Sequence, residues 1–228
     1  MGIFLALLII LLWLGHLFYS LVFLEPDPSL PLTYVHMIIQ GYLFTGLFIT
    51  GHDAIHGSIS RKKRVNDFFG WLASFLFAGL SYKKLTKNHW LHHRFAGTAE
   101  DPDFYVKSQK FWRWWLVFMY RYVTLIQIII MAVAFNVLLT WFSESSLILF
   151  WIIPAFLGTF QMFYFGVYQP HKLPHQEDMK PFNARTQGRN HWLAMLSCYF
   201  FGYHYEHHDS PRTPWWKLYQ IKNQQKRG

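Results

Sequence analysis

Histidines occur in three short groups in this sequence, at spacings that suit metal binding. The first group holds two histidines four residues apart, and the other two hold three each, at positions i, i+3 and i+4. The groups are His52 and His56; His89, His92 and His93; and His204, His207 and His208. Residues three and four apart share one face of a helix, so each group can direct its imidazoles at one point. Because imidazole is a common protein ligand for transition metals, the pattern predicts a metal site.

The number of imidazoles predicts two metal ions rather than one. A zinc ion is satisfied by about four ligands, and the sequence offers eight or nine. A bis-histidine haem needs only its axial ligands, and a zinc pair would more often include carboxylate bridges. Cys198 is the only cysteine, which excludes a thiolate cluster and a disulfide within the chain. Imidazole suits iron, copper, nickel and zinc alike, so the ligand type leaves the metal open.

The composition indicates a lipid environment. Of the 228 residues, 53% are hydrophobic and 14% are charged, whereas soluble domains average about 25% charged residues. The formal net charge is +9, but the basic residues lie beside apolar runs, which favours an anionic membrane surface over nucleic acid as the partner. A metal site beside apolar segments suits oxygen activation on a lipid-like substrate, for which the protein supplies orientation and a dry pocket.

Four apolar runs are long enough to cross a bilayer as helices. They cover residues 3–24, 32–52, 122–142 and 147–168. The first run has no basic n-region and no small-residue cleavage site, so we expect a retained helix rather than a cleaved signal peptide. The run 68–82 is shorter and has basic residues on both sides, which predicts a re-entrant or interfacial hairpin.

The distribution of basic residues predicts the orientation of the chain. Loops 25–31 and 143–146 contain no Lys or Arg and are expected to face outward, while the basic loop 53–121 and the basic tail face the cytoplasm. The three histidine groups, and His171 just after the fourth span, then lie at one cytoplasmic depth. We therefore expect an all-α integral membrane protein with four transmembrane helices and a cytoplasmic histidine-rich cap, forming a single domain over residues 1–228.

Several polar residues near the histidines are candidates to orient them. Metal-bound imidazoles usually donate their second ring nitrogen to a carboxylate or a carbonyl. The candidates are Asp53, Asp101, Asp103, Glu206 and Asn190. Their alternative role is helix capping or turn formation, as in the Asp-Pro-Asp sequence at 101–103. His175 and His191 are also near the groups, but neither has a spaced partner, so both stay outside the predicted ligand set.

The histidine patterns HxxxH, HxxHH and HxxHH resemble those of the membrane di-iron desaturase and hydroxylase superfamily. The flanking sequence is similar to bacterial-type β-carotene ketolases, in the same order along 50–217. The matching segments are HDAIHGS at 52–58, HHRFAGT at 92–98, DPDF at 101–104, FG to PH over 165–171, NAR at 183–185, FGYHYEHH at 201–208 and PWW at 214–216. These flanking segments together are more specific than the histidine patterns alone.

This resemblance implies a dioxygen-dependent di-iron oxygenase of the membrane. Such ketolases convert the methylene at ring position 4 of β-carotene to a ketone by two hydroxylations and loss of water, giving echinenone and then canthaxanthin. Some members also accept hydroxylated rings and form astaxanthin. The resemblance further implies two non-haem iron ions, dioxygen, and reducing equivalents from a ferredoxin-type donor protein. His171 joins the grouped histidines as an expected iron ligand, because superfamily members often take an extra ligand from this region.

Other functions are open on the same scaffold. A β-carotene 3-hydroxylase, or a fatty-acyl hydroxylase or desaturase, would share the fold, and fold-level likeness cannot separate these activities. The flanking segments favour the ketolase. The alternative of a different class is a non-catalytic metal- or haem-binding membrane protein. A carrier would place polar ligands along its spans, whereas these histidines gather at one face.

Overall fold

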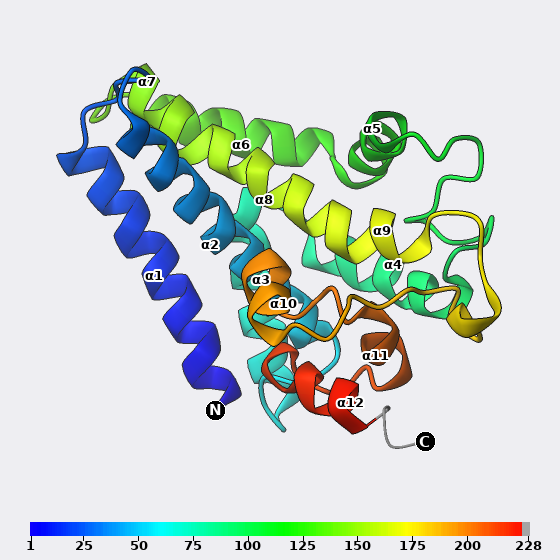
Figure 1. Cartoon of the computed structure of the whole chain (residues 1–228). Coiled ribbons are helices and arrows are strands. Elements are labelled where there is room, and N and C mark those ends of the chain that lie inside the picture. Colours follow the sequence, from blue (N-terminus) through cyan, green and yellow to red (C-terminus); the bar gives the residue numbers. More distant parts are fainter. Residues whose placement is uncertain (225–228) are drawn as a thin grey trace.

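The protein is a bundle of α-helices (Figure 1). The structure is a computed structural model that describes residues 1–224, and these residues contain no β-strand. The longer helices are α1 (Gly2–Phe23), α2 (Pro31–Ile55), α3 (Lys63–Ala78), α4 (Tyr82–Phe95), α5 (Phe111–Tyr122), α6 (Leu125–Leu138), α8 (Ile153–Phe163), α10 (His191–Cys198), α11 (His204–Asp209) and α12 (Leu218–Gln224). The short helical segments are α7 (Glu144–Leu147), η1 (Ile148–Ile152), η2 (Tyr164–Tyr168), α9 (Gln169–His171), η3 (Glu177–Met179) and η4 (Trp215–Lys217).

Three helical stretches are long and apolar enough to cross a membrane. They are α1, α2 and the continuous helix Glu144–His171, which runs from α7 to α9. A fourth crossing exists if α5 and α6, which meet at a bend of 90°, count as one broken span. The all-helical architecture with three or four apolar spans agrees with the prediction.

The third predicted span, 122–142, is wrong in its extent. Helix α6 covers only Leu125–Leu138, which is 14 residues, or about 21 Å at about 1.5 Å per residue, short of the roughly 30 Å hydrocarbon core. The backbone at Val123 is extended, and the side chain of Thr124 accepts a hydrogen bond from the N–H of Gln127. The helix therefore starts anew after a sharp bend, which hydropathy alone cannot reveal because the sequence stays apolar across it.

Helix α2 lies at the centre of the bundle, packed against α1, α3 and α8 (Figure 1). Its contact with α8 depends on glycine. A Cβ atom at Gly158 would lie 3.0 Å from the carbonyl oxygen of Gly41 and 2.8 Å from Cβ of Phe44. Small residues allow helix backbones to approach closely in this way. The tight contact fixes the position of the C-terminal end of α2, which carries His52 and His56.

The apolar run 68–82, predicted as a re-entrant or interfacial hairpin, is mostly a single helix, α3, and α3 forms a helical hairpin with α4, which begins only at Tyr82. Helix α3 ends at Gly79, whose φ of 65° is left-handed and whose N–H bonds to the carbonyl of Phe75. Helix α4 begins after Ser81, whose side chain accepts a hydrogen bond from the N–H of Lys84. A left-handed glycine followed by a serine cap is a common way to end one helix and start another. The second histidine group lies within α4.

The long helix Glu144–His171 contains two π-helical segments, η1 and η2. Each is followed closely by a proline, Pro154 after η1 and Pro170 after η2. Proline has no N–H and its ring clashes with the carbonyl four residues earlier, so a wider turn at each place accommodates it. Segment η2 leads directly into His171. The distortion therefore lies where this helix approaches the other histidines.

The C-terminal segment folds back beside α2 and α4 (Figure 1). Helix α10 forms the first part of the apolar stretch 191–203. Tyr199 then adopts a left-handed conformation and stacks on Tyr42 of α2, with 4.4 Å between the ring centroids. This turn allows α11 to present the third histidine group to α4. The last residues of the basic tail, predicted to face the cytoplasm, lie outside the described residues.

Candidate metal centre

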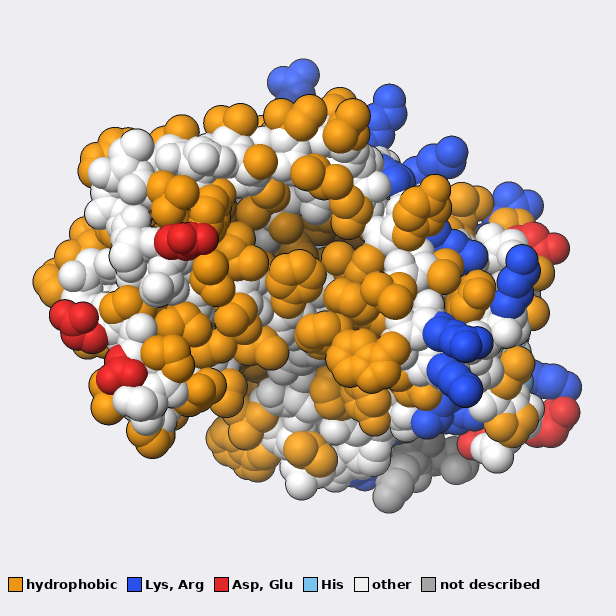
Figure 2. Space-filling view, turned by 90° about the horizontal axis from the view of Figure 1, so that it is seen from above, with side chains coloured by type: hydrophobic (Ala, Val, Ile, Leu, Met, Phe, Trp, Pro, Cys, Tyr) orange, Lys and Arg blue, Asp and Glu red, His pale blue; other side chains and the backbone are white. Residues whose placement is uncertain are grey.

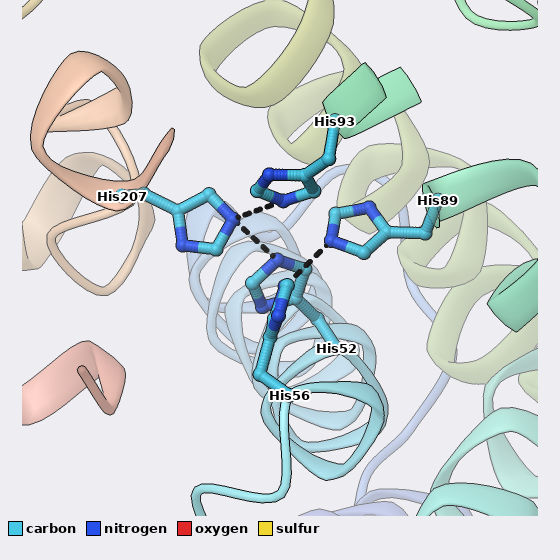
Figure 3. A group of neighbouring side chains, drawn as sticks. All are labelled: His52, His56, His89, His93 and His207. Carbon is cyan, nitrogen blue, oxygen red and sulfur yellow. Dashed lines mark hydrogen bonds between the residues drawn. The ribbon is translucent and has the colours of Figure 1, made fainter. Parts of the chain in front are cut away.

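The structure collects all nine predicted histidines into two groups, and all of them are buried except the half-buried His93. We call them group one and group two. Group one is His52, His56, His89, His93 and His207, and group two is His92, His171, His204 and His208. Within each group the ligand nitrogens all lie within 4.8 Å of one another, so each group can hold a metal ion. Figure 3 shows group one, with side chains from α2, α4 and α11 pointing toward a common centre.

Both HxxHH patterns divide between the two groups, which corrects the expectation that each pattern aims at one point. On α4, His89 and His93 belong to group one and His92 to group two. On α11, His204 and His208 belong to group two, and His207 to group one. At about 100° per residue, positions i and i+4 are only about 40° apart, whereas i+3 and i+4 diverge by about 100°. Both helices therefore contribute to both groups and hold them side by side.

The nitrogen contacts in group one fit a bound cation. Nε2 of His207 lies 3.1 Å from Nε2 of His52 and 2.9 Å from Nε2 of His93. Nε2 of His56 lies 2.7 Å from Nε2 of His89. A neutral imidazole nitrogen carries either one proton or one lone pair, so His207 Nε2 cannot make good hydrogen bonds to both neighbours. A cation bound by the lone pairs would satisfy all of these nitrogens together.

Group two contains a buried nitrogen without a partner. His171 is fully buried, and its Nδ1 donates to the carbonyl oxygen of Asn183 at 2.9 Å. Its Nε2 has no hydrogen-bond partner among the described residues. Because Nδ1 holds the proton, Nε2 presents a lone pair toward the other histidines. This carbonyl–histidine arrangement is the one that usually orients a metal ligand, so the residues of group two also fit a metal ion.

Asp101 contacts one of the predicted ligands directly. Its carboxylate oxygens lie 3.0 and 3.1 Å from Nδ1 of His92, and it also accepts the backbone N–H of Gly97. Burial alone would lower the pKa of His92, but the negative charge of Asp101 outweighs burial and raises that pKa to about 9. The Nδ1 proton of His92 is thereby held against Asp101, and Nε2 faces group two.

Asp103 and Asp53 each lie near a histidine and also accept a hydrogen bond from another segment of the chain. Asp103 accepts a hydrogen bond of 2.5 Å from the hydroxyl of Tyr122, and its other oxygen lies 3.9 Å from Nδ1 of His92. Asp53 accepts the backbone N–H of Trp215, and its carboxylate lies 3.5 Å from Nδ1 of the neighbouring His52. Both carboxylates are buried. They therefore connect the α2 and α4 histidines to segments that are distant in sequence.

The remaining polar candidates point elsewhere. Glu206 is fully buried, but it accepts hydrogen bonds from Lys222 and Thr186, which ties α11 to α12. Asn190 is exposed and caps α10 by accepting the N–H of Leu193. Within residues 1–224 neither side chain bonds to any of the nine histidines. The carboxylate of Glu206 therefore helps to fix the position of α11 as a whole.

Three partners of the histidine region are not among the candidates that the sequence suggests. They are the carbonyl of Asn183, the backbone N–H of Trp215 and the hydroxyl of Tyr122. The first two lie in the NAR and PWW segments, which were recognised only as similarities to known proteins. His175 and His191, which were not among the predicted ligands, lie outside both groups. His191 instead bonds to the hydroxyl of Tyr203.

A mostly apolar cavity of about 250 Å³ reaches the histidines. Four histidines from both groups line it, together with side chains of α3, α5, α6 and α8. Its apolar wall includes Phe77, Phe118, Met131 and Ala155. Ligand sites of this kind bind apolar molecules and use a few polar groups to orient them. The arrangement can therefore bring part of a hydrophobic molecule next to two metal-binding groups.

Comparison with known proteins agrees with this site. The sequence profile described as fatty acid desaturase matches residues 29–131 and 119–227. A zeaxanthin 4-ketolase of Chlamydomonas reinhardtii is 40% identical over 78% of this chain and 41% of its own length. Two β-carotene ketolases come from Paracoccus. That of strain PC1 is 40% identical over 78% of this chain and 74% of its own length. That of strain N81106 / MBIC 01143 is 34% identical over 92% of this chain and 87% of its own length.

No solved structure matches the chain. The profile match covers most of the chain, including all nine histidines of groups one and two. The Paracoccus relatives are covered over most of their own length, so the similarity extends well beyond the histidine motifs. The chain belongs to the fatty acid desaturase family, within the membrane desaturase and hydroxylase superfamily that its histidine patterns predicted.

Proposed function

We propose that this protein is a carotenoid ketolase that oxidises the ring 4-methylene of β-carotene to a ketone. The observation that carries the proposal is the apolar cavity lined by histidines of both metal-binding groups. It supports oxidation of a hydrophobic substrate at a carbon that lacks any activating polar group. The names of the relatives at 34–40% identity supply the substrate class.

The proposed reaction balances as two oxygenations of one carbon. Each consumes one dioxygen, two electrons and two protons, replaces one C–H bond by C–OH, and releases one water. The resulting geminal diol loses a further water to leave the ketone. Reaction at one ring gives echinenone, and reaction at both gives canthaxanthin.

We assign two iron ions to the nine histidines, five in group one and four in group two. When bound, the iron would supply the activation of dioxygen, which no side chain can perform. The chain itself holds the ligand rings in place. Asp101 fixes His92 and the carbonyl of Asn183 fixes His171. The apolar cavity excludes water and leaves the substrate ring facing the histidines.

The charge distribution supports an orientation in the membrane. Figure 2 shows acidic side chains without Lys or Arg at the left end of the molecule, most of the Lys and Arg with a few acidic side chains toward the right, and a broad apolar surface between them. The α1–α2 connection and the start of α7, which contain Glu25 and Glu144 and no Lys or Arg, lie at the same end of the bundle (Figure 1). We propose that the basic, histidine-bearing end faces the cytoplasm. There it would bind an acidic, ferredoxin-type electron donor. We also propose that residues 1–228 form one domain.

Filling the cavity should block turnover without removing metal. Ala155→Phe adds a ring to the cavity wall on α8, and we expect at least about a tenfold loss of ketolation, since misplacement by about 1 Å alone can cost far more. Metal content should stay at the wild-type level, because every histidine of both groups is retained. Ala132→Phe makes the same change on the exposed side of α6 and should leave turnover unchanged. Normal turnover in Ala155→Phe would exclude this cavity as the substrate site.

Expression in a β-carotene-producing host that also supplies ferredoxin tests the proposed function. We expect pigment extracts to contain 4-keto products. Extracts with only 3-hydroxy products would assign the chain to the hydroxylases, and unchanged β-carotene with a functional donor would reject the ketolase activity.

A further inference from the structure

The polar side chains in the cavity wall have partners, with one exception. The four histidines belong to groups one and two. The hydroxyl of Tyr122 donates to Asp103, and that of Thr159 donates to the backbone carbonyl of Ala155. The side-chain amide of Gln127 lines the same cavity, and it makes no hydrogen bond to any residue in the described part of the chain.

Gln127 occupies a position that favours a ligand contact. It lies in the first turn of α6, next to the bend with α5, and is 7% exposed. Its backbone N–H is already bonded to Thr124, so only the side chain is left without a partner. The side chain also lies close to Gly79 at the end of α3. Unpaired polar side chains inside a membrane-type bundle are costly, and they commonly mark a functional contact.

The chemistry of the amide selects the group that would bind it. An amide offers both donors and an acceptor, and a hydroxyl offers one donor and two lone pairs, so the two match in either orientation of the amide. A plain hydrocarbon in the cavity would leave the amide without a partner and without water. A molecule with a hydroxyl would satisfy it while the apolar wall covers the rest.

We propose that Gln127 is a specificity-determining residue that binds a hydroxyl of the substrate, so that the cavity favours a hydroxylated carotenoid over a plain hydrocarbon one. This inference rests on the proposed ketolase function. Sites that contain a buried polar group discriminate against analogues that cannot bind it, because the group is then left unpaired. Gln127 makes no hydrogen bond to any histidine of groups one and two, so we assign it no part in holding metal.

Competition between zeaxanthin, whose rings carry hydroxyls, and β-carotene, which carries none, tests this role. Gln127→Met keeps the length of the side chain and removes the amide. In this variant we expect the ratio of kcat/KM for zeaxanthin to that for β-carotene to decrease by about threefold to tenfold. Asn136→Met removes an amide from the exposed side of the same helix, outside the cavity, and should leave the ratio unchanged. An unchanged ratio in Gln127→Met would overturn the proposal.

A binding measurement separates this inference from the ketolase function. Purified protein is mixed with equal amounts of the two pigments, and the zeaxanthin fraction that co-purifies should be lower in Gln127→Met than in the wild type. If the wild type converts neither pigment, the ketolase proposal fails, while equal pigment fractions in the two proteins would reject the role of Gln127. Gln127→Leu serves as the second variant if Gln127→Met does not accumulate in the membrane.

Discussion

Replacing His207 by alanine should abolish ketolation and remove metal from group one. His207 is 1% exposed, and its Nε2 lies within 3.1 Å of the nitrogens of His52 and His93. Within group one it thus joins α11 to the histidines of α2 and α4. Removing a partner that only orients a metal ligand already costs about 10–100-fold, so loss of the ligand itself should cost at least about 100-fold. Pigment analysis and metal content of the purified variant measure the two effects.

His191→Ala is the matched control for this substitution. His191 lies outside both groups and bonds to the hydroxyl of Tyr203 and the side chain of Asn223. The same chemical change there should leave metal content and ketolation near the wild-type level. Full activity in His207→Ala, or equal loss in both variants, would show that the ligand assignment is wrong.

Asp101→Asn should lower ketolation by about 10–100-fold, the usual cost of losing a partner that orients a metal-bound histidine. The amide keeps the size of the carboxylate but removes the negative charge that holds the Nδ1 proton of His92. The ring of His92 should then be less well oriented toward group two, and metal should be lost from group two more readily than from group one. The measurements are turnover and the metal retained after dialysis against a chelator.

Two comparisons make this result specific. Asp67→Asn removes a carboxylate that pairs with Lys63 at the exposed start of α3, and it should have little effect. The double variant His92→Ala with Asp101→Asn should be no worse than His92→Ala alone, because Asp101 acts through His92. Additive losses in the double variant would mean that Asp101 has a separate role.

The histidines were predictable because their information is local. Spacings of three and four residues, together with apolar runs that end near them, identify eight of the nine members of groups one and two, and the ninth, His171, comes from the resemblance to the superfamily. The split of each HxxHH pattern between two groups was not predicted. Positions i+3 and i+4 point in different directions on any helix. Which metal-binding group each of these histidines faces depends on where α2 and α11 pack against α4.

Other features depend on tertiary packing and carry little signal in the sequence. Asn183 and Trp215 contribute backbone groups to the histidine region, and any residue type can do so. The bend before Thr124 interrupts an apolar run that reads as one span. Gln127 looks like an isolated polar residue in that run, and only the cavity beside it indicates a ligand-binding role for its amide. Asn190 shows the reverse error, since closeness in sequence suggested a role that the α10 cap explains.

Iron content of the purified protein tests the central claim most directly. Nine histidines in two groups predict two iron ions per chain after reconstitution under reducing conditions. The same measurement on His207→Ala should give no more than about one iron, since group two keeps its four histidines. A wild-type protein that binds no more than one iron per chain, or that shows a haem Soret band, would contradict the two-metal account.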